Sequence, residues 1–439
     1  MTREMKDSGV EWIGDIPLSW DCDKVEVLFE EVTKKNFNGQ QTKALQFKYG
    51  TIIPKKNFDS TEEYVAKVIR NYTVVDKGTL VLNGLNLNYD FVSKRVAIVN
   101  EKGAITSAYI TFKPRSDEID SSFANYMFKT YDECKAFHNM GGGVRKILNF
   151  GELKKNYFPC PNKTEQLKIV NFLDKKCSEI DSLASDIEKQ ISVLENYKKS
   201  IITETVTKGL NPNVEMKDSG VEWIGKIPSN WNKARLKDLC SFGKGLSITK
   251  ADLCQDGEPV ISYGQIHSKT NISTSIKEDL IRFVPSKKCE FCKVSLCSVG
   301  DFIFADTSED KDGCGNFIYV DRKNVFAGYH TIILKSLITP TKFLSYLFQS
   351  DDWRYQIRLS ANGIKVFSIT QKILSSTTVV LPPLREQVEI TNYLDKKCSE
   401  IDSLISEKKE QLKKLASYKQ SMIYEYVTGK KEVPTQEIA

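Results

Sequence analysis

Apolar residues recur every seven positions in two long, charged segments of the chain. In the first segment they are Leu173, Ile180, Ile187, Leu194 and Ile201. In the second, the matching positions are Leu394, Ile401, Lys408, Leu415 and Met422. A seven-residue spacing is typical of a helix that packs along another helix. The pattern therefore predicts two long helices with coiled-coil seams, which differ where Lys408 replaces an isoleucine.

The first helix is expected from Glu165 to about Val206, a length of roughly 60 Å at 1.5 Å per residue. Thr164 is the expected N-cap, because its hydroxyl oxygen can accept an unpaired N–H of the first turn. Gly209 and Pro212 should end the helix, since glycine favours the C-terminal cap and proline cannot continue it.

An interleaved apolar line should complete the seam of the first helix. It is expected at Leu183 and Tyr197, with interruptions at Lys176 and Gln190. Lysine pairs at 198–199 and 413–414 are expected on solvated faces of the helices.

Outside these helices, short runs of β-branched and aromatic residues alternate with Gly, Asn and Asp turn signals. In the first half of the chain the runs cover 43–53, 71–75, 78–85, 95–99 and 104–112, and in the second half 258–266, 294–306, 316–320 and 329–336. Helix-like stretches follow at 123–140 and 343–360. This pattern of short strands, turns and helices predicts two mixed α/β globular blocks.

The chain also repeats itself. LDKKCSEIDSL at 173–183 returns unchanged at 394–404, and MKDSGVEWIGDIPLSW at 5–20 returns at 216–231 with three positions changed. Each short segment (a strap) contains breakers and is too small to fold alone, so its aromatic residues should pack on a larger body. Strap, block and helix therefore form one unit that is used twice.

Weaker sequence similarities occur in the same order in the two blocks. The Tyr-Gly pair at 49–50 matches the pair at 263–264, and the runs 77–83 and 107–112 match 299–305 and 327–333. Gly142 and Leu153 match Gly363 and Leu374. We infer one fold with two diverged surfaces, as expected for a protein with two recognition heads.

The predicted division of the chain is a strap at 1–20, a block at 21–161, a helix at 162–210, a strap at 211–231, a block at 232–382, a helix at 383–430 and a tail at 431–439. We expect the tail after Gly429 to be disordered.

Composition adds only mild constraints. The chain has 439 residues, of which 40% are hydrophobic and 27% charged, and its net charge of +6 leans slightly toward polyanions. Eleven cysteines, a charged N-terminal sequence and the lack of an apolar run of roughly 18 residues favour a reducing, cytoplasmic setting without a membrane span.

Common catalytic motifs are missing from the sequence. It contains no P-loop, no GxSxG, no HExxH, no GxGxxG after a strand and no DPPY-like tetrapeptide of an amino-methyltransferase. The three histidines are far apart in sequence, which gives acid–base or metal catalysis little support. We expect a chain without catalytic residues.

Four cysteines in the second block form a weak candidate for a zinc site. Cys289 and Cys292 form a CxxC pair, followed by Cys297 and Cys314. The later spacing is irregular and the first block has no such set, so reduced, half-buried thiols without metal are the expectation.

The doubled, ordered layout resembles the specificity (S) subunit of a Type I restriction–modification enzyme over nearly the whole chain. The marks are GVEWIGDIPLSW and GVEWIGKIPSNW before the blocks, the LDKKCSEID helices, and P-x-x-x-E-Q at the helix entries, Pro161/Glu165/Gln166 and Pro382/Glu386/Gln387. The implied fold class is α+β. It has two homologous mixed α/β target recognition domains, separated by two long antiparallel coiled-coil helices in a pseudo-twofold tandem repeat.

The resemblance also implies a function. Each block would read one half of a split, asymmetric target in double-stranded DNA, and the helices would set the spacing of the half-sites. The chain itself would be non-catalytic. Two modification (methyltransferase) subunits would dock on the repeated frame, restriction subunits would join them, and S-adenosylmethionine would bind to the partner.

A rival from another class is a coiled-coil scaffold with two protein- or glycan-binding modules. Failure to shift DNA in a gel in the presence of the modification subunit would favour it. A self-contained methyltransferase is disfavoured by the missing motifs.

Candidate DNA contacts lie in glycine-flanked loops and at strand ends, where a backbone can approach a ligand. Lys, Arg, Asn and Gln side chains there could contact phosphates or base edges. The candidates are Lys48, Tyr49, Asn83, Asn86, Lys94, Arg95, Arg145, Lys146, Lys244, Lys250, Tyr263, Gln265, Lys311 and Lys365. The strongest are those in the GGGVRK and ANGIKV loops, because these loops occupy matching places in the two blocks.

Overall fold

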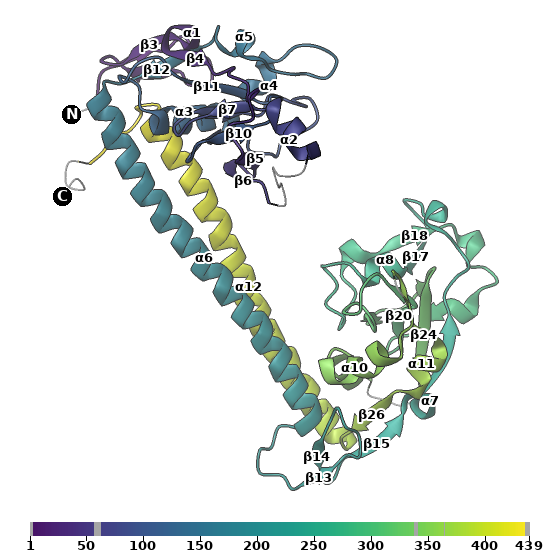
Figure 1. The fold of residues 1–439 in the computed structure, drawn as a ribbon. Helices are drawn as coiled ribbons and strands as arrows, with labels where there is room; N and C mark the ends of the chain where they lie inside the picture. The colour runs from purple at the N-terminus through teal and green to yellow at the C-terminus, as the bar shows by residue number, and fades with distance from the viewer. Residues whose placement is uncertain (1–2, 57–62, 338–340, 364, 435–439) are drawn as a thin grey trace. The chain divides into compact units, whose positions relative to one another are not determined.

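The computed structural model describes residues 3–56, 63–337, 341–363 and 365–434 (Figure 1). They fall into two compact units. Unit 1 comprises Met1–Ile187 and Glu410–Ala439, and unit 2 comprises Glu188–Lys409. Each unit therefore contains one strap, one block and a segment of both long helices.

The described residues of unit 1 form twelve strands and five short helices, besides its segments of the long helices. The strands are β1 (Met5–Asp7), β2 (Asp15–Pro17), β3 (Asp21–Lys24), β4 (Phe29–Glu31), β5 (Ala44–Lys48), β6 (Thr51–Pro54), β7 (Thr73–Val75), β8 (Leu80–Leu82), β9 (Val96–Ile98), β10 (Gly103–Ile105), β11 (Ile110–Pro114) and β12 (Tyr157–Cys160). The helices are α1 (Val25–Leu28), α2 (Glu63–Arg70), α3 (Ser121–Glu133), α4 (Ala136–Met140) and α5 (Phe150–Leu153).

Unit 2 repeats this inventory with additions. Its strands are β13 (Met216–Asp218), β14 (Lys226–Pro228), β15 (Asn232–Arg235), β16 (Cys240–Lys244), β17 (Glu258–Ile261), β18 (Arg282–Val284), β19 (Leu296–Cys297), β20 (Phe302–Ala305), β21 (Thr307–Ser308), β22 (Phe317–Tyr319), β23 (Val325–Ala327), β24 (Thr331–Ser336), β25 (Phe367–Ser368) and β26 (Thr378–Leu381). Its helices are α7 (Leu236–Leu239), α8 (Tyr263–Ile266), α9 (Lys342–Leu347), α10 (Asp351–Ser360) and α11 (Gln371–Ser376), with 3-10 turns η1 (Lys250–Asp252), η2 (Glu278–Leu280), η3 (Ser286–Lys288) and η4 (Lys293–Ser295).

The two units share one sheet topology. Unit 1 has four-stranded sheets of order β6-β5-β10-β7 and β4-β11-β8-β9, and unit 2 has β18-β17-β23-β19 and β16-β24-β20-β22 in the matching places. Even the parallel pair recurs, as β5 with β10 and as β17 with β23. The inference of one fold used twice is confirmed, and the predicted α+β class with it.

Local signals altered two of the predicted elements. The run expected as a strand at 258–266 ends at Ile261, because Ser262 and Gln265 form a capping box that starts α8. The stretch at 123–140 is two helices, because Lys135 adopts a left-handed φ of 58° between α3 and α4.

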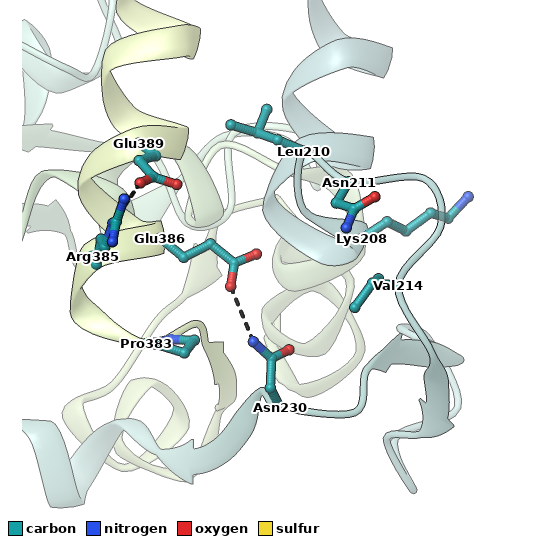
Figure 2. Close-up of a pocket in the computed structure, with 9 residues that line it drawn as sticks. All are labelled: Lys208, Leu210, Asn211, Val214, Asn230, Pro383, Arg385, Glu386 and Glu389. Carbon is teal, nitrogen blue, oxygen red and sulfur yellow. Dashed lines mark hydrogen bonds and ion pairs between the residues drawn. The ribbon is translucent and has the colours of Figure 1, made fainter.

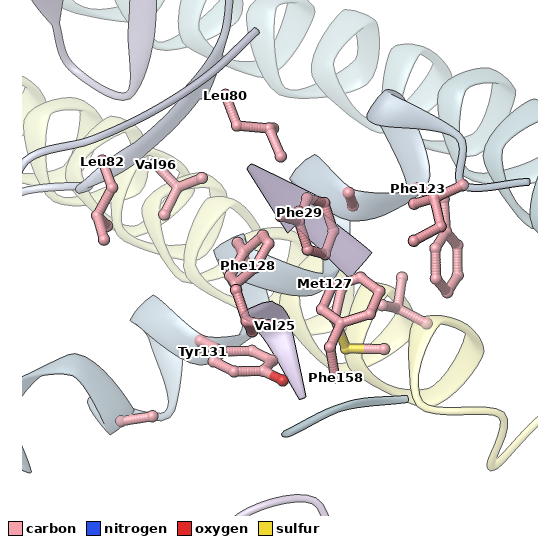
Figure 3. Packing of buried hydrophobic residues seen from close by; sticks show 14 of the residues in the cluster. Val25, Phe29, Leu80, Leu82, Val96, Phe123, Met127, Phe128, Tyr131 and Phe158 are labelled. Atoms are coloured by element: carbon pink, nitrogen blue, oxygen red, sulfur yellow. The ribbon is translucent and has the colours of Figure 1, made fainter. Parts of the chain in front are cut away.

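The first strap is part of the core of unit 1. Ile13, Ile16 and Trp20 are buried there, and the Trp12 ring lies 4.0 Å from that of Tyr131. The centre of this core is aromatic, with Phe29 meeting Phe128 and other rings edge-on (Figure 3). The second strap does the same in unit 2 through Ile227 and Trp231. The expectation that both straps pack on a larger body is confirmed.

Two long helices, α6 (Lys163–Lys208) and α12 (Leu384–Val427), match the predicted heptad segments. The N-cap prediction was wrong. Helix α6 begins one residue before Thr164, and the Asn162 Oδ1 atom accepts from the Glu165 N–H at 3.0 Å. Gly209 ends α6 as predicted, with φ +77°, a conformation that favours glycine.

The interleaved line of the seam was also predicted wrongly. Leu183 and Tyr197 are 50% and 53% exposed, whereas Cys177 and Ile191 are buried. The second line lies four residues, not three, after the first, because steps of four and three alternate along one face of a helix. Ile187 is buried and Lys408 only half-buried, so the predicted asymmetry is present.

Within each unit the two helix segments run antiparallel. In unit 1, Lys419 Nζ contacts Asp181 Oδ1 at 2.6 Å, and the rings of Phe172 and Tyr426 lie 4.5 Å apart. In unit 2, Lys198 Nζ contacts both oxygens of Asp402 at 2.7 Å. Lys198 therefore has a partner on α12, which corrects its assignment to a solvated face.

The predicted disorder of the tail does not hold for its described part. Lys430 Nζ donates to the carbonyl oxygens of Ile13 and Asp15, and Val433 packs against the core of unit 1. Residues 435–439 lie outside the described residues. In the described part of the chain, no helix is both long enough and apolar enough to span a membrane.

Candidate nucleic-acid interface

Two loops of unit 1 lie side by side and carry most of its predicted contact residues. Strand loop 1 (residues 83–95) joins β8 to β9, and glycine loop 1 (141–147) joins α4 to the segment before α5. The Leu87 N–H donates to the Lys146 carbonyl oxygen at 3.0 Å, and the Asn88 amide donates to that of Val144 at 3.1 Å. Gly142 and Ile147 close the second loop through reciprocal backbone hydrogen bonds.

Arg95 does not belong to the exposed surface, and its prediction as a DNA contact was wrong. Its side chain is 0% exposed, and its guanidinium donates to the carbonyl oxygens of Asn83, Leu85 and Asp90 at 3.1, 2.8 and 2.5 Å. The guanidinium thus supplies donors to three backbone acceptors that face inward. Arg95 therefore holds the shape of strand loop 1 from within.

His138 supports the same loop. Its Nε2 atom lies 3.1 Å from the Asp90 carbonyl oxygen, and its ring stacks on that of Phe91 at 4.6 Å. The Asp132 carboxylate accepts the Arg95 backbone N–H at 2.7 Å, and burial raises the pKa of Asp132. A buried layer thus fixes the loop while its outer side chains stay free.

Several other candidates of unit 1 are exposed on this surface. Lys94, Asn86 and Arg145 are exposed, and Asn86 adopts a left-handed φ of 54°. Lys146 is half-buried because its Nζ atom donates to the His138 carbonyl oxygen at 3.2 Å. Asn83 is half-buried, and its side-chain oxygen accepts the Leu85 N–H, so it shapes the turn.

The tip of the β5–β6 hairpin adjoins strand loop 1. Tyr49 is 85% exposed, and Lys48 Nζ lies 5.5 Å from the centre of its ring. Gly50 packs so closely on Lys94 that a Cβ atom added there would lie 2.8 Å from the Lys94 Cβ. The structure therefore brings Lys48 and Tyr49 next to Lys94.

Sequence reasoning missed the apolar side chains of this surface. Tyr89, Phe91, Val92 and Val144 are 54 to 94% exposed. Aromatic residues among glycines and lysines in a loop were the available signal, because a soluble loop does not otherwise favour them. Such groups can stack on bases or contact the thymine methyl group.

Unit 2 pairs two loops at the same places in its fold. Strand loop 2 (residues 306–316) joins β20 to β22, and glycine loop 2 (the described residues 361–363 and 365–368) lies between α10 and the segment before α11. Strands β21 and β25 pair these loops directly, and the Ile369 N–H donates to the Asp306 carbonyl oxygen at 2.7 Å. Lys311 and Lys365 are exposed, and Lys311 Nζ lies 6.0 Å from the centre of the Phe367 ring.

A half-buried arginine organises strand loop 2, and it comes from a different element. Arg354 of α10 donates to the carbonyl oxygens of Asp312 at 2.7 Å and Cys314 at 3.2 Å, and to the side-chain oxygen of Asn316. Burial lowers the pKa of Arg354 to about 10, so it stays charged at neutral pH. Apart from its place in a predicted helix, nothing in the sequence marks this residue.

A pocket of about 510 Å³ lies beside strand loop 2. Its walls include Tyr263 and the acidic residues Glu309, Asp310 and Asp312. The Tyr263 hydroxyl donates to Glu309 Oε1 at 3.3 Å. Carboxylates in a groove accept hydrogen bonds from the cytosine N4 amino group, so this surface differs chemically from that of unit 1.

The remaining candidates of unit 2 have separate surroundings. The Gln265 side-chain oxygen accepts the Ser262 N–H at 3.1 Å and so caps α8. Lys244 ends β16, at the same sheet end as strand loop 2, since Lys244 and Phe304 both pair with Ile332. Lys250 is exposed on η1.

The four candidate cysteines do not converge. Cys289, Cys297 and Cys314 are buried in three different hydrophobic clusters, and Cys292 packs beside Cys289. Burial raises the pKa of the Cys297 thiol to about 12. Among the residues that the structure describes, no group of three or more His, Cys, Asp and Glu side chains could hold a metal ion.

Solved structures share this fold. One, from work on complex assembly and conformational transition of the type I R-M system, aligns with a TM-score of 0.71 at 14% identity and covers 94% of this chain and 98% of its own. The HsdS subunit from Thermoanaerobacter tengcongensis aligns with a TM-score of 0.52, 14% identity and the same coverage. At these identities the likeness shows that the fold is shared.

The sequence comparisons give the family. The model of the Type I restriction modification DNA specificity domain matches residues 45–193 and 228–414. The chain therefore belongs to this family. Similar curated proteins from Methanocaldococcus jannaschii are the Type I restriction enzyme MjaVIII specificity subunit (22% identical, covering 94% of this chain and 93% of the relative) and the putative MjaX specificity subunit (24%, covering 96% of each).

Proposed function

We propose that this chain is the non-catalytic subunit that gives a Type I restriction–modification complex its DNA sequence specificity. Each unit reads one half of a split target in double-stranded DNA with its strand loop and glycine loop. Two modification subunits dock on the repeated straps and helices, carry S-adenosylmethionine and transfer the methyl group, and restriction subunits join that complex. Membership of the specificity family supports this proposal.

One observation supports the proposal that the target is split and asymmetric. Both units have the same sheets, and both hold a strand loop against a glycine loop, yet the exposed chemistry differs. Unit 1 presents Lys94, Arg145 and exposed aromatic rings, whereas unit 2 presents acidic groups beside Lys311. Different donors and acceptors on one frame select different bases.

The test is DNA binding by this chain in complex with its modification subunit. We expect one split sequence to bind with a strong salt dependence, since phosphate contacts release counterions. Arg145→Ala should weaken binding about tenfold and relax one half-site only. Lys102→Ala is the matched control, because Lys102 is exposed but pairs with Asp76 away from these loops. Equal affinity of the complex for all duplexes would refute the proposal.

The spacer role has its own test. One heptad inserted into each long helix, after Lys189 and after Glu410, adds about 10 Å of helix, which corresponds to roughly three base pairs. We expect the preferred spacer of the target to lengthen while both half-sites stay the same. An insertion after Tyr197 alone should also change the spacing. An unchanged spacer in both variants would contradict the ruler role.

A further inference from the structure

The joint between strap and helix differs between the units at the position of Arg3. In unit 1, Arg3 Nη2 lies 2.5 Å from Glu165 Oε1, and the Arg3 guanidinium lies 5.7 Å from the centre of the Trp20 ring. Arg3 thus connects the strap to the first turn of α6. A guanidinium between a carboxylate and an indole combines an ion pair with a cation–π contact.

Unit 2 has the same joint without the arginine. Glu386 and Trp231 occupy the positions of Glu165 and Trp20 in the repeats. The residue that corresponds to Arg3 is Val214, and both precede the identical sequence Glu-Met-Lys-Asp. Backbone bonds support this alignment, because the Glu4 and Glu215 carbonyl oxygens accept from Leu18 and Ser229 at 2.9 and 2.8 Å.

A pocket of about 310 Å³ lies at this joint (Figure 2). Val214 and Pro383 form part of its wall, and the Glu386 carboxylate enters it. The Glu386 carboxylate accepts a hydrogen bond from the Asn230 amide at 3.4 Å, a long contact with a neutral donor. We name this space the Glu386 pocket.

The cations around the pocket do not replace Arg3. Arg385 Nε is bonded to Glu389 Oε1 at 3.0 Å, and the amino end of Lys208 points away from Glu386 in Figure 2. Gly209 closes the other side, where an added Cβ would lie 2.9 Å from Glu386 Oε1. Glu386 is therefore held in place, but among the described residues it lacks the charged partner that its counterpart has.

We propose that the Glu386 pocket receives an arginine side chain of a modification subunit. This rests on the proposed function for the identity of the partner, whereas the chemistry comes from unit 1, where the same frame holds a guanidinium. A planar guanidinium can bond to the carboxylate and lie near the indole at once. Because the first joint is already filled by Arg3, the two docking places are unequal, and one modification subunit binds more tightly than the other.

The experiment measures stepwise binding of the modification subunit to the full chain. Val214→Arg should fill the pocket from within and weaken the tighter step about tenfold, the size expected for losing one charge-assisted bond. Glu386→Gln should weaken the same step by a similar factor. Val214→Leu is the matched control and should bind as the wild type does. Arg3→Val, which opens the first joint, should tighten the weaker step.

The possible results separate two failures. If the wild-type chain binds no modification subunit, both the proposed function and this inference fall. If it binds two copies and Val214→Arg and Glu386→Gln both keep the wild-type affinities, only the pocket assignment is overturned. Thermal unfolding of each variant checks the fold, and Val214→Arg stays informative because it recreates the ion pair that unit 1 already contains.

Discussion

Units 1 and 2 hold their outer loops by the same means but with different residues. In unit 1 this is done by the buried Arg95, the residue before β9, and in unit 2 by the half-buried Arg354, in α10. Both guanidinium groups bond to carbonyl oxygens of the strand loop that follows the same strand of the fold. A loop that projects from a sheet leaves such acceptors unpaired, and one planar group with five donors satisfies several of them. The shared fold leaves carbonyl oxygens of this loop in need of donors in both units, and a different arginine supplies the donors in each.

The long helices show the opposite behaviour, because their repeated residues make the same contacts in both units. Asp174 accepts from the Tyr126 hydroxyl at 2.7 Å, and Asp395 accepts from that of Tyr346 at 2.6 Å. Leu173 and Leu394 are fully buried, and Cys177 and Cys398 are buried beside them. Asp181 and Asp402 pair with lysines of the neighbouring helix. The identity of LDKKCSEIDSL in its two copies thus follows from identical packing and pairing.

The largest expected effect comes from removing these two arginines. Arg95→Ala or Arg354→Ala removes the guanidinium donor from three loop carbonyl groups, which should cost about 3 kcal/mol of local stability. Hydrogen exchange of residues 83–95 should accelerate in the first variant and that of 306–316 in the second. Lys94→Ala and Lys365→Ala are exposed controls and should change stability by less than about 0.5 kcal/mol. Equal protection of both loops in all variants would contradict their structural role.

A smaller effect is expected at the tyrosines that join each block to its helix. Tyr126→Phe should cost about 1 kcal/mol, and Tyr346→Phe less, because Asp395 also accepts from Lys342 Nζ at 2.7 Å. Urea unfolding of each variant beside the wild type measures the difference. An equal loss of unfolding free energy in the two variants would show that Lys342 does not compensate for the missing tyrosine hydroxyl.

The same tyrosine gives a pH dependence. Burial and the Asp174 carboxylate raise the pKa of Tyr126 well above its usual value of 10. The folded-state pKa exceeds the unfolded one, so the stability contribution is complete below pH 10 and is lost as the pH rises further. The advantage of the wild type over Tyr126→Phe should therefore shrink above pH 10. If the stability advantage of the wild type grew above pH 10, the folded state would lower the pKa of Tyr126 and not raise it.

The smallest effect is expected from the ion pairs along the helices. Exchanging the charges of Asp181 and Lys419, or of Lys198 and Asp402, keeps each pair, whereas Lys419→Ala or Lys198→Ala removes it. Because these groups are partly solvated, each removal should cost about 0.5 kcal/mol. Thermal unfolding at low and high salt provides the measurement. Costs of several kcal/mol would mean that the pairs are far better shielded from water than their exposure indicates.

Much of the architecture could be predicted from the sequence because it depends on local periodicity. The heptad lines placed both long helices, and alternating runs with glycine and asparagine turns placed most strands. The duplicated straps and helices indicated two copies of one fold, and their order carried the family resemblance. These features repeat over many residues, so a single misjudged position does not change the result.

Tertiary structure decided the properties that depend on contacts between side chains far apart in the sequence. Arg95 follows a lysine in a polar loop and reads as an exposed base contact, yet it is buried because the carbonyl oxygens of its own loop turn inward to meet it. Asn162, rather than Thr164, caps α6, and Lys430 in the tail bonds to the strap more than 400 residues earlier in the chain. The sequence by itself determined the elements and their duplication. Only the packed chain decided which charges are exposed, because exposure depends on partners that no local pattern specifies.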